Sequence, residues 1–329
     1  MQNRTELIRR LADGRFHSGE ALGQLLGVSR AAVWKRLKQL QLDLGLVVDA
    51  VKGRGYRLRE PLDLLDEATI LALLPAQLQA SLGPLHLHQT IHSTNSWLMQ
   101  RGGEGAASGS VCLAESQSGG KGRHGRHWVS PFGRNLYLSL LWRFEMAPTQ
   151  LAGLSLASAV GVLRALRELN CPGAGLKWPN DILWEQRKLA GLLLEVSGEA
   201  GGPSQVVIGV GLNTRLGDEG RDIDQPWVDL ASIPGVAHFS RSQLAALLIR
   251  HLLEVIRCYR EQGLSGFLDE WHRNDLFMGK QVEIRSTGQS HRGEHLGIDP
   301  TGGIRLRVDG EERCFYAGEV SLRAETESL

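Results

Sequence analysis

Cysteine is scarce in this chain of 329 residues, and its placement excludes one kind of site. The four cysteines, Cys112, Cys171, Cys258 and Cys314, lie far apart, and none belongs to a Cys-x-x-Cys pair. This spacing excludes a zinc ribbon and argues against a disulfide framework. It favours a reducing, cytoplasmic compartment.

Long apolar runs are also absent. A membrane-spanning helix needs about 18 or more consecutive apolar residues, and the sequence has no such run. The first ten residues carry Arg4, Glu6, Arg9 and Arg10 and lack the apolar core of a signal peptide. We therefore expect a cytoplasmic protein with no membrane partner. The hydrophobic share of 42% suffices for a large core, and the length allows roughly two or three domains.

The usual nucleotide-binding motifs are incomplete. Gly120, Gly122 and Gly125 match a dinucleotide fingerprint, but Pro131 and Gly133 follow where that motif requires a helix. A Walker A loop requires Ser or Thr after its Lys, whereas Gly122 follows Lys121. Both nucleotide folds are therefore disfavoured.

The stretch 115–128 is the most distinctive of the chain. It contains four glycines, three Lys or Arg residues and two histidines, and it ends at Trp128. Glycine lets backbone approach a ligand closely, and Lys and Arg side chains bind phosphate or carboxylate. The pattern predicts a loop that folds over a phosphate-containing ligand. The alternative is a flexible surface loop with solvated charges.

The N-terminal 62 residues predict a winged helix-turn-helix domain. Residues 1–60 hold twelve Lys and Arg against six Asp and Glu, whereas the remainder is acidic. Ser18 and Ser29 are expected to cap two short helices separated by Gly27, and a hairpin formed by 46–48 and 56–58 follows. The expected DNA-contacting residues are Ser29, Arg30, Trp34, Lys35 and Lys38 on the second helix and Lys52 and Arg54 at the hairpin tip. The alternative is a winged helix used only for protein packing.

The remaining chain divides into a linker at 63–82, a large region at 83–275 and a module at 276–329. The large region alternates strands and helices, including a helix from Gln150 to about Leu169 capped by Thr149, a turn at 187–191 and a helix at 242–262. Residues 214–226 are polar and predict a mobile lid. Short strands with turns at 302–303 and 309–310 predict a small C-terminal β-barrel.

Several polar clusters in the large region have two interpretations. His86 and His88 share one face of a strand, and an exposed face is favoured over a metal site. Ser93, Thr94 and Asn95 suit either helix capping or the binding of a small polar heterocycle. The run from Lys177 to Asp181, followed by Lys188, could place cations and a carboxylate on one ligand. Taken alone, Lys188 suits a solvated hairpin charge.

Taken together, these motifs resemble those of biotin protein ligases. The matching runs, in family order and spacing, are 93–95, 115–128, 130–137, 177–181, 187–191 and 209–213. With the winged helix in front, the whole chain resembles the bifunctional biotin ligase and biotin operon repressor. The resemblance implies a multidomain α+β fold with a central mixed sheet related to class II aminoacyl-tRNA synthetases and an SH3-like C-terminal barrel.

The resemblance also implies a two-step reaction. Biotin and MgATP form biotinyl-5′-AMP, and a lysine of the biotin carboxyl carrier protein of acetyl-CoA carboxylase then accepts the biotin. The implied catalytic residues are Arg123, Lys188 and Asp181. The implied biotin-binding residues are Ser93, Thr94, Asn95, Gln117, Lys121, Gly122, Arg123 and Lys188. Trp128, Lys177, Asn180 and Asn213 would bind the adenylate or ATP, and no fixed metal site is implied.

The repressor form would bind the operator of biotin synthesis genes as a homodimer when loops 117–128 and 214–226 are ordered by the adenylate. Lys121 departs from the Arg that is common at this position in the family, which puts a bidentate contact there in question. The alternatives are a transcription factor that only senses biotin, a ligase with a purely structural winged helix, and a lipoate ligase.

Overall fold

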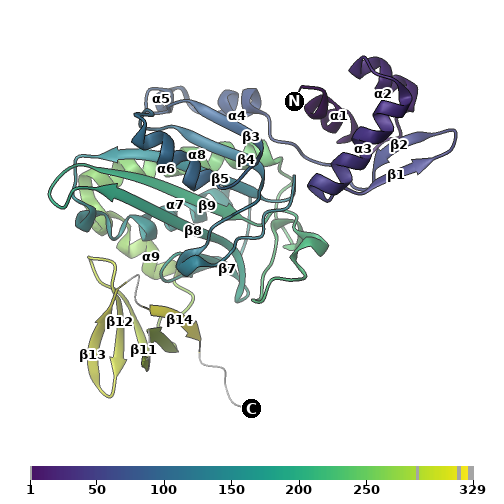
Figure 1. Cartoon of the computed structure of the whole chain (residues 1–329). Coiled ribbons are helices and arrows are strands. Elements are labelled where there is room, and N and C mark those ends of the chain that lie inside the picture. Colours follow the sequence, from purple (N-terminus) through teal and green to yellow (C-terminus); the bar gives the residue numbers. More distant parts are fainter. Residues whose placement is uncertain (1, 287–288, 317–319, 325–329) are drawn as a thin grey trace, which may run out of the picture.

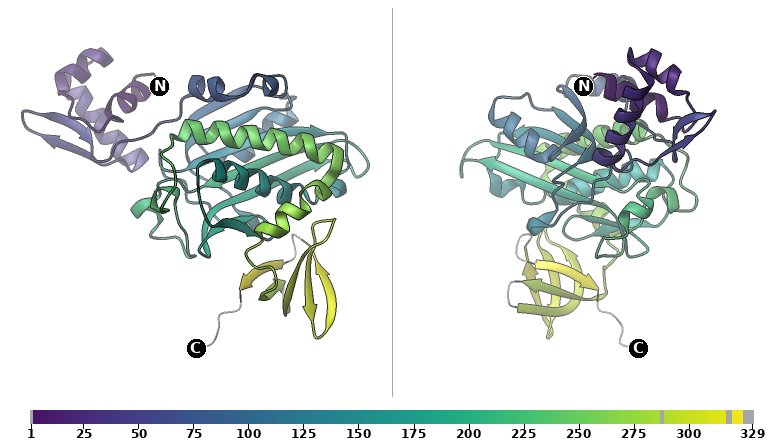
Figure 2. Two further views of the ribbon diagram at one scale, coloured as in Figure 1. Left: turned by 180° about the vertical axis from the view of Figure 1, so that it is seen from behind. Right: turned by 45° about the vertical axis from the view of Figure 1, so that its right-hand side comes forward.

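The computed structural model describes residues 2–286, 289–316 and 320–324. Figure 1 shows an N-terminal helical unit with a projecting hairpin, a large central sheet flanked by helices, and a small C-terminal sheet. The N- and C-terminal units lie at separate edges of the central one, so each contacts the central unit rather than the other (Figures 1 and 2).

The N-terminal unit is the predicted winged helix-turn-helix. Its helices are α1 (Gln2–Leu11), α2 (Gly19–Leu26) and α3 (Arg30–Leu44), and its hairpin is β1 (Val48–Val51) with β2 (Gly55–Leu58). Ser18 and Ser29 cap α2 and α3 through their hydroxyls, and Gly27 ends α2 in the left-handed conformation, as predicted. The wing begins two residues later than expected, because Leu46 is buried in the core instead of pairing in the hairpin.

One residue of the central unit completes the N-terminal core. Val33, Leu37 and Leu40 of α3 face inward, as their helical spacing predicts. Phe132, which lies far along the chain, is 3% exposed and packs in the same cluster. The N-terminal unit is therefore joined to the central unit by apolar packing as well as by the chain.

The central unit is a seven-stranded mixed sheet with the order β3-β4-β5-β9-β8-β7-β6. Only β3 and β4 are parallel among its neighbouring pairs in the described chain. The strands are β3 (Leu85–Ile91), β4 (Val111–Gln117), β5 (Leu136–Phe144), β6 (Ala174–Lys177), β7 (Asp181–Trp184), β8 (Arg187–Gly198) and β9 (Ser204–Leu212). The mixed sheet agrees with the expected fold class. The relation to class II synthetases remains a prediction.

Helices cover both faces of this sheet. The long helices α7 (Leu154–Glu168) and α8 (Arg241–Gln262) lie side by side across one face, as the left view of Figure 2 shows. Helix α6 (Thr94–Gly103) packs on the other face, where Leu98 meets Cys112 of β4. Val111 and Leu113, the neighbours of Cys112, belong to the main core, as the two-residue period of a strand requires.

The segment 148–168 is the only one in the described chain that is long and apolar enough to cross a membrane. Its most apolar window is 72% buried inside the protein, as is typical of a core helix. Shorter helices are α4 (Glu67–Leu73), α5 (Ala76–Gln79) and α9 (Leu268–Asn274).

Two predicted boundaries in the central unit were wrong. The helix expected from Gln150 is a 3-10 turn at Pro148–Leu151 followed by α7, so Thr149 caps nothing. Gly153 stands at the break, where an added Cβ would meet Leu264 at 2.8 Å. The turn expected at 187–191 is confined to Glu185 and Gln186, which adopt positive φ values of 45° and 60°. Strand β8 therefore already begins at Arg187.

The C-terminal unit is a five-stranded antiparallel sheet with the order β13-β12-β11-β10-β14. Its strands are β10 (Gln281–Ser286), β11 (Gln289–Ile298), β12 (Ile304–Val308), β13 (Glu311–Phe315) and β14 (Val320–Ala324). The predicted turns at 302–303 and 309–310 separate β11 from β12 and β12 from β13. The sheet is compatible with an SH3-like barrel, which remains a prediction, and residues 325–329 of the expected module lie outside the described chain.

Candidate functional site

A cavity of about 800 Å³ lies where β7, β8 and β9 meet the loop 121–129. It gathers segments that are distant in the sequence, including the start of α6, the end of β4 and residues 222–226. Twelve of the predicted ligand residues line it: Ser93, Thr94, Asn95, Gln117, Lys121, Gly122, Arg123, Trp128, Lys177, Asn180, Asp181 and Lys188.

One wall of the cavity is a network of amides and hydroxyls. Ser93 caps α6, which confirms the capping interpretation, and Thr94 and Asn95 follow on the cavity wall. The binding of a small polar heterocycle by this cluster stays a prediction. Gln117 Oε1 accepts hydrogen bonds from the Thr94 N–H at 2.8 Å and the Thr94 hydroxyl at 3.1 Å. Asn95 Nδ2 donates to Leu193 O at 3.1 Å. These groups are held in fixed orientations and can both donate and accept.

Ser139 of β5 was not predicted as part of this network. Its hydroxyl lies 2.8 Å from Thr94 Oγ1 and 2.6 Å from Asn95 Oδ1. The side chain is fully buried between Leu138 and Leu140 in the middle of a strand. The sequence did offer one signal for Ser139, a single hydroxyl inside an apolar strand. A buried polar group needs a hydrogen-bond partner, so such a residue points to a polar neighbour.

Glycines of the neighbouring strands make room for this wall. A Cβ on Gly209 would lie 2.2 Å from Asn95 Oδ1, and one on Gly211 would lie 2.5 Å from the Trp128 indole. Gly191 of β8 also borders the Trp128 ring, at 3.1 Å from its added Cβ. A side chain at Gly209 or Gly211 would therefore displace Asn95 or Trp128, and one at Gly191 would press on the Trp128 ring.

The part of the cavity at the start of β8 is its cationic end. Lys188 Nζ lies 2.8 Å from Asp181 Oδ1, and both side chains are less than one-fifth exposed, at 16% and 17%. The same ammonium lies 5.5 Å from the centre of the Trp128 ring. Lys188 is thus a partly buried, paired cation and not the solvated hairpin charge that is expected of a lone turn lysine.

Burial lowers the pKa of Arg123 below its ordinary value, and the nearby Asp181 carboxylate opposes that shift. A guanidinium stays charged at neutral pH even so. Lys121 Nζ lies 3.3 Å from Glu195 Oε1 on β8, where the pair is more exposed. The cavity therefore has Lys188 and Arg123 beside Asp181 at its cationic end, whereas Lys121 lies seven residues farther along β8, past the Leu193 carbonyl that Asn95 contacts.

The glycine-rich loop closes on itself. Trp128 N donates to Gly120 O at 2.9 Å, and Gly122 N donates to Arg126 O at 2.7 Å, with a 3-10 turn at Arg123–Gly125 between them. A second cavity of about 660 Å³ lies behind the loop, against Leu192–Val196 and the 3-10 turn before α7. The loop is therefore a thin partition with open space on both sides.

Asn213 is the one predicted ligand residue that does not line the cavity. Its Nδ2 donates to Lys188 O at 3.3 Å and to Val228 O at 3.2 Å, so the side chain is turned into the protein. Asn213 thus supports the Lys188 backbone, and its expected role at the adenylate stays a prediction. Asp222 to Pro226 and Phe277 line the cavity instead; the former belong to the predicted lid, and Phe277 had no signal in its local sequence.

The pair of histidines on β3 does not form an exposed face. The rings of His86 and His88 lie 4.8 and 5.0 Å from the Trp97 ring of α6, edge to face. His88 Nε2 is buried, and burial lowers the pKa of this imidazole. No group of three or more His, Cys, Asp or Glu residues placed to hold a metal occurs in the described ranges.

The predicted DNA-contacting residues form a separate, solvent-exposed surface on the N-terminal unit. Ser29, Arg30, Trp34, Lys35 and Lys38 of the α3 segment and Lys52 and Arg54 of the wing are all exposed. Trp34 keeps half of its surface, 50%, in solvent. The Arg54 guanidinium lies 4.2 Å from the centre of the Phe16 ring, and Arg57 lies 4.7 Å from it. The wing arginines are therefore stacked in place on an aromatic ring.

Three family models match the chain in the order of its structural units. The HTH domain model matches residues 3–57, the biotin/lipoate A/B protein ligase family model matches residues 87–213, and the biotin protein ligase C terminal domain model matches residues 277–323. The ligase match covers the amide wall, the glycine-rich loop and Lys188.

Full-length relatives agree with these matches. The chain is similar to the bifunctional ligase/repressor BirA of Escherichia coli, with 40% identity over 97% of each chain. It is 36% identical to the biotin–[acetyl-CoA-carboxylase] ligase of Mycobacterium tuberculosis over 69% of this chain and 85% of that protein. The structure of the Aquifex aeolicus biotin protein ligase in complex with biotin and ATP matches with a TM-score of 0.64 and 25% identity, over 74% of this chain and 99% of that one. This chain therefore belongs to the biotin protein ligase family and has the helix-turn-helix domain of its ligase/repressor members.

Proposed function

We propose that this ligase forms biotinyl-5′-AMP from biotin and MgATP, and that it then transfers biotin to a lysine of the biotin carboxyl carrier protein of acetyl-CoA carboxylase. The observation that carries the proposal is that one cavity is lined both by the amide wall and by the Lys188–Asp181 pair of the cationic end. The name of the Mycobacterium tuberculosis relative supports the choice of carrier.

The amide wall suits the ureido ring of biotin. That ring offers two N–H donors and one carbonyl acceptor, and Ser93, Thr94, Asn95 and Gln117 would pair with them. Asn95 and Gln117 are amides, which donate and accept at once. Their existing bonds to Leu193 O and to Thr94 fix their orientation, so little freedom is lost when biotin binds.

The cationic end suits the reacting groups. An oxygen of the biotin carboxylate attacks the α-phosphorus of ATP, the new P–O bond forms, and the bond to the β-phosphate oxygen breaks to release pyrophosphate. Lys121, Gly122, Arg123 and Lys188 would hold the carboxylate and the phosphoryl oxygens, which otherwise repel each other. Such a step depends mainly on positioning and electrostatics.

The adenylate would lie between the two ends. Trp128 would contact the adenine, Lys177 and Asn180 would contact the nucleotide, and Asn213 would act through Lys188. Mg²⁺ would arrive with the ATP phosphates, because Asp181 is a single carboxylate already paired with Lys188 and Mg²⁺ commonly binds through one or two carboxylates plus substrate phosphates.

In the second step a carrier lysine amine attacks the carbonyl carbon of the mixed anhydride, the amide bond forms, and AMP leaves with the former acyl–phosphate oxygen. The amine also loses a proton. Asp181 would orient the amine, since it lies at the cationic end within reach of Lys188.

The N-terminal unit would bind the operator of biotin synthesis genes, with biotinyl-5′-AMP as corepressor and a homodimer as the binding species. The exposed basic α3 and wing favour this over a purely structural role. The proposed location is the cytoplasm. The proposed units are residues 1–62, a linker at 63–82, the ligase at 83–275 and the C-terminal module at 276–329. The first of these is supported by the N-terminal hydrophobic cluster, to which Phe132 alone of the described buried residues beyond 62 contributes.

The test measures the two steps separately. The purified protein is titrated with biotin by calorimetry, and pyrophosphate is then counted after MgATP is added. A carrier domain and its Lys→Arg variant are added last, with lipoate as competitor. One pyrophosphate per site and biotin transfer to the carrier, but not to its variant, are expected. Binding without pyrophosphate would make the chain a biotin sensor, and transfer of lipoate would overturn the choice of substrate.

A further inference from the structure

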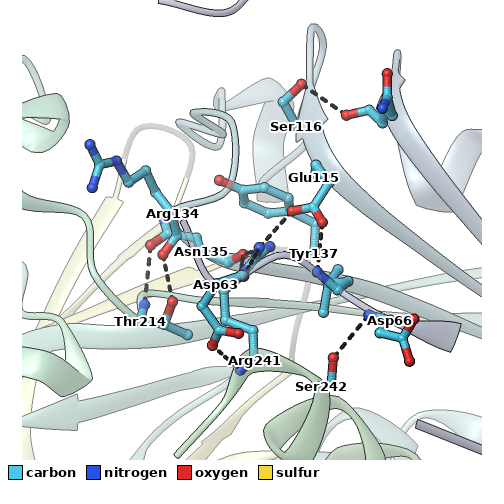
Figure 3. A network of polar contacts seen from close by, with 12 residues as sticks. Asp63, Asp66, Glu115, Ser116, Arg134, Asn135, Tyr137, Thr214, Arg241 and Ser242 are labelled. Carbon is cyan, nitrogen blue, oxygen red and sulfur yellow. Dashed lines mark hydrogen bonds and ion pairs between the residues drawn. The ribbon is translucent and has the colours of Figure 1, made fainter. Parts of the chain in front are cut away.

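Asn135 is fully buried just before β5, and its polar groups bond two different segments, residues 213–214 and Arg241. Its Nδ2 donates to Asn213 Oδ1 at 3.4 Å, and its Oδ1 accepts from the Thr214 N–H at 3.1 Å. Its backbone carbonyl accepts from Arg241 Nε at 3.0 Å and from Arg241 Nη2 at 2.6 Å. Figure 3 shows Asn135 between Thr214 and Arg241.

Asn213 connects Asn135 to the ligand cavity. The Asn213 amide can donate to Lys188 O and Val228 O only while its oxygen faces Asn135 Nδ2. The Lys188 N–H donates to Pro226 O at 2.9 Å, so the lid segment and Lys188 are held together. The hydrogen bond between the Asn135 and Asn213 amides thus fixes the backbone of Lys188, whose ammonium pairs with Asp181.

Arg241 connects the same node to the linker of the N-terminal unit. Its Nη1 donates to Asp63 O at 2.9 Å and to Glu115 Oε2 at 2.5 Å, and the Arg241 and Glu115 side chains are only 3% and 6% exposed. Glu115 Oε1 accepts from the Leu65 N–H at 2.7 Å, and Ser242 Oγ accepts from the Asp66 N–H at 2.9 Å (Figure 3). The linker is therefore bonded to the residues that hold Asn135.

The segment just before Asn135 reinforces this connection. Phe132 packs in the N-terminal core, and Arg134 pairs with Glu60 at 2.5 Å. The Gly133 N–H donates to Glu115 O at 2.9 Å. A displacement of the N-terminal unit would therefore pull on both sides of Asn135.

We propose that Asn135 is a positioning residue of the ligase site and that Arg241 makes its position depend on the linker. Through Asn135 and Arg241, ligand binding in the cavity changes how firmly residues 63–66 are held, and the hydrogen bonding of residues 63–66 changes the affinity for the ligand. Such coupling is reciprocal by thermodynamic necessity. The inference rests on the proposed binding of biotin and ATP in the cavity.

The test uses Asn135→Asp, which preserves size and the acceptor for Thr214. Because an oxygen then faces Asn213 Oδ1, the Asn213 amide must turn over and release Lys188 O and Val228 O. The matched control is Ser204→Ala, which deletes an equally buried hydrogen bond, to Met146 O, at the far end of β9. The Asp63 carboxylate also accepts from the Arg241 backbone N–H, with 2.5 Å between N and Oδ2. A second variant, Asp63→Ala with Ser242→Ala, removes this bond and the bond from the Asp66 N–H to Ser242, and it leaves the buried Glu115–Arg241 pair intact.

Each protein is titrated with biotin, and amide hydrogen exchange of residues 60–68 is followed with and without biotin plus MgATP. In the parent, the ligands should slow exchange in this segment. Asn135→Asp should weaken biotin binding roughly tenfold, the loss of about one hydrogen bond, and abolish the ligand effect on the linker, although no linker bond is changed. The loosened linker should weaken biotin binding severalfold, and the control should match the parent.

Asn135→Asp with the affinity and linker response of the control would overturn the inference while leaving the ligase function intact. If Asn135→Asp does not fold, the linker variant decides, and unchanged biotin affinity there overturns the inference. A parent that binds no biotin would overturn the proposed ligand site and this inference together.

Discussion

Lys188 and Asp181 form a close ion pair at the cationic end of the cavity, with 2.8 Å between Nζ and Oδ1. We expect Lys188→Gln to lower kcat/KM for pyrophosphate release by at least about a hundredfold, as the loss of one preorganised charge does elsewhere. Asp181→Asn should slow transfer to the carrier more than pyrophosphate release, because its proposed partner is the incoming amine. Single-turnover measurements of both steps check this. Equal losses in both steps for Asp181→Asn would contradict its assigned role.

Trp128 rests on Gly191 and Gly211, and its indole N–H is buried with no partner in the described part of the chain. Gly211→Ala should push the ring aside, because the new Cβ would lie 2.5 Å from it. We expect the KM for ATP to rise roughly tenfold, with the Kd for biotin nearly unchanged. Trp128→Phe should raise the KM less, since it keeps the ring but loses the donor. A matched rise in biotin Kd would place Trp128 at the biotin end instead.

His88 makes stability depend on pH. Burial, with a smaller effect from His86, lowers the pKa of His88 below the ordinary value of 6.5. The unfolded chain therefore binds a proton at this site more readily than the folded one, so stability falls as pH drops below 6.5. We expect His88→Gln to flatten the decline of the thermal midpoint between about pH 7.5 and pH 5. Calorimetric scans across this range check the slope, and a variant with the parent's slope would contradict the assignment.

Arg54 at the wing tip is stacked on Phe16. If it contacts phosphate, Arg54→Gln should weaken DNA binding for every sequence and reduce the slope of log K against log salt by about one. Phe16→Leu should weaken binding less and keep the slope, because the charge remains but its position is no longer fixed. Arg257→Gln, an exposed change on α8, is the matched control. Titration of labelled biotin-operator DNA at several salt concentrations measures the affinity and the salt slope. An unchanged slope for Arg54→Gln would show that this arginine does not contact phosphate.

Local signals explain which parts of the fold could be predicted. Ser18, Gly27 and Ser29 act within a few residues of their own position, so the helix-turn-helix could be placed from sequence. The break at Gly153 could not be foreseen, because it depends on Leu264, which is distant along the chain.

The candidate site shows the same limit. The glycine-rich loop and Lys188 carry chemistry that is visible in the sequence, whereas the orientation of Asn213 depends on Lys188 O and Val228 O, both outside its own strand. Phe132 stands in a Pro-Phe-Gly run that is typical of a loop. Nothing in that run indicates that its ring belongs to a core formed by residues 7–62.

Phe132 also limits how freely the gene can be shortened. A ligase trimmed of residues 1–62 would present that ring to water and leave Arg134 without Glu60. An enzyme without residues 1–62 would therefore be more soluble with a polar residue at position 132. If the N-terminal unit is exchanged for that of a relative, residue 132 must also be changed to fit the new N-terminal core. The N-terminal unit and the ligase unit therefore share part of a core, and neither can be replaced without a change in the other.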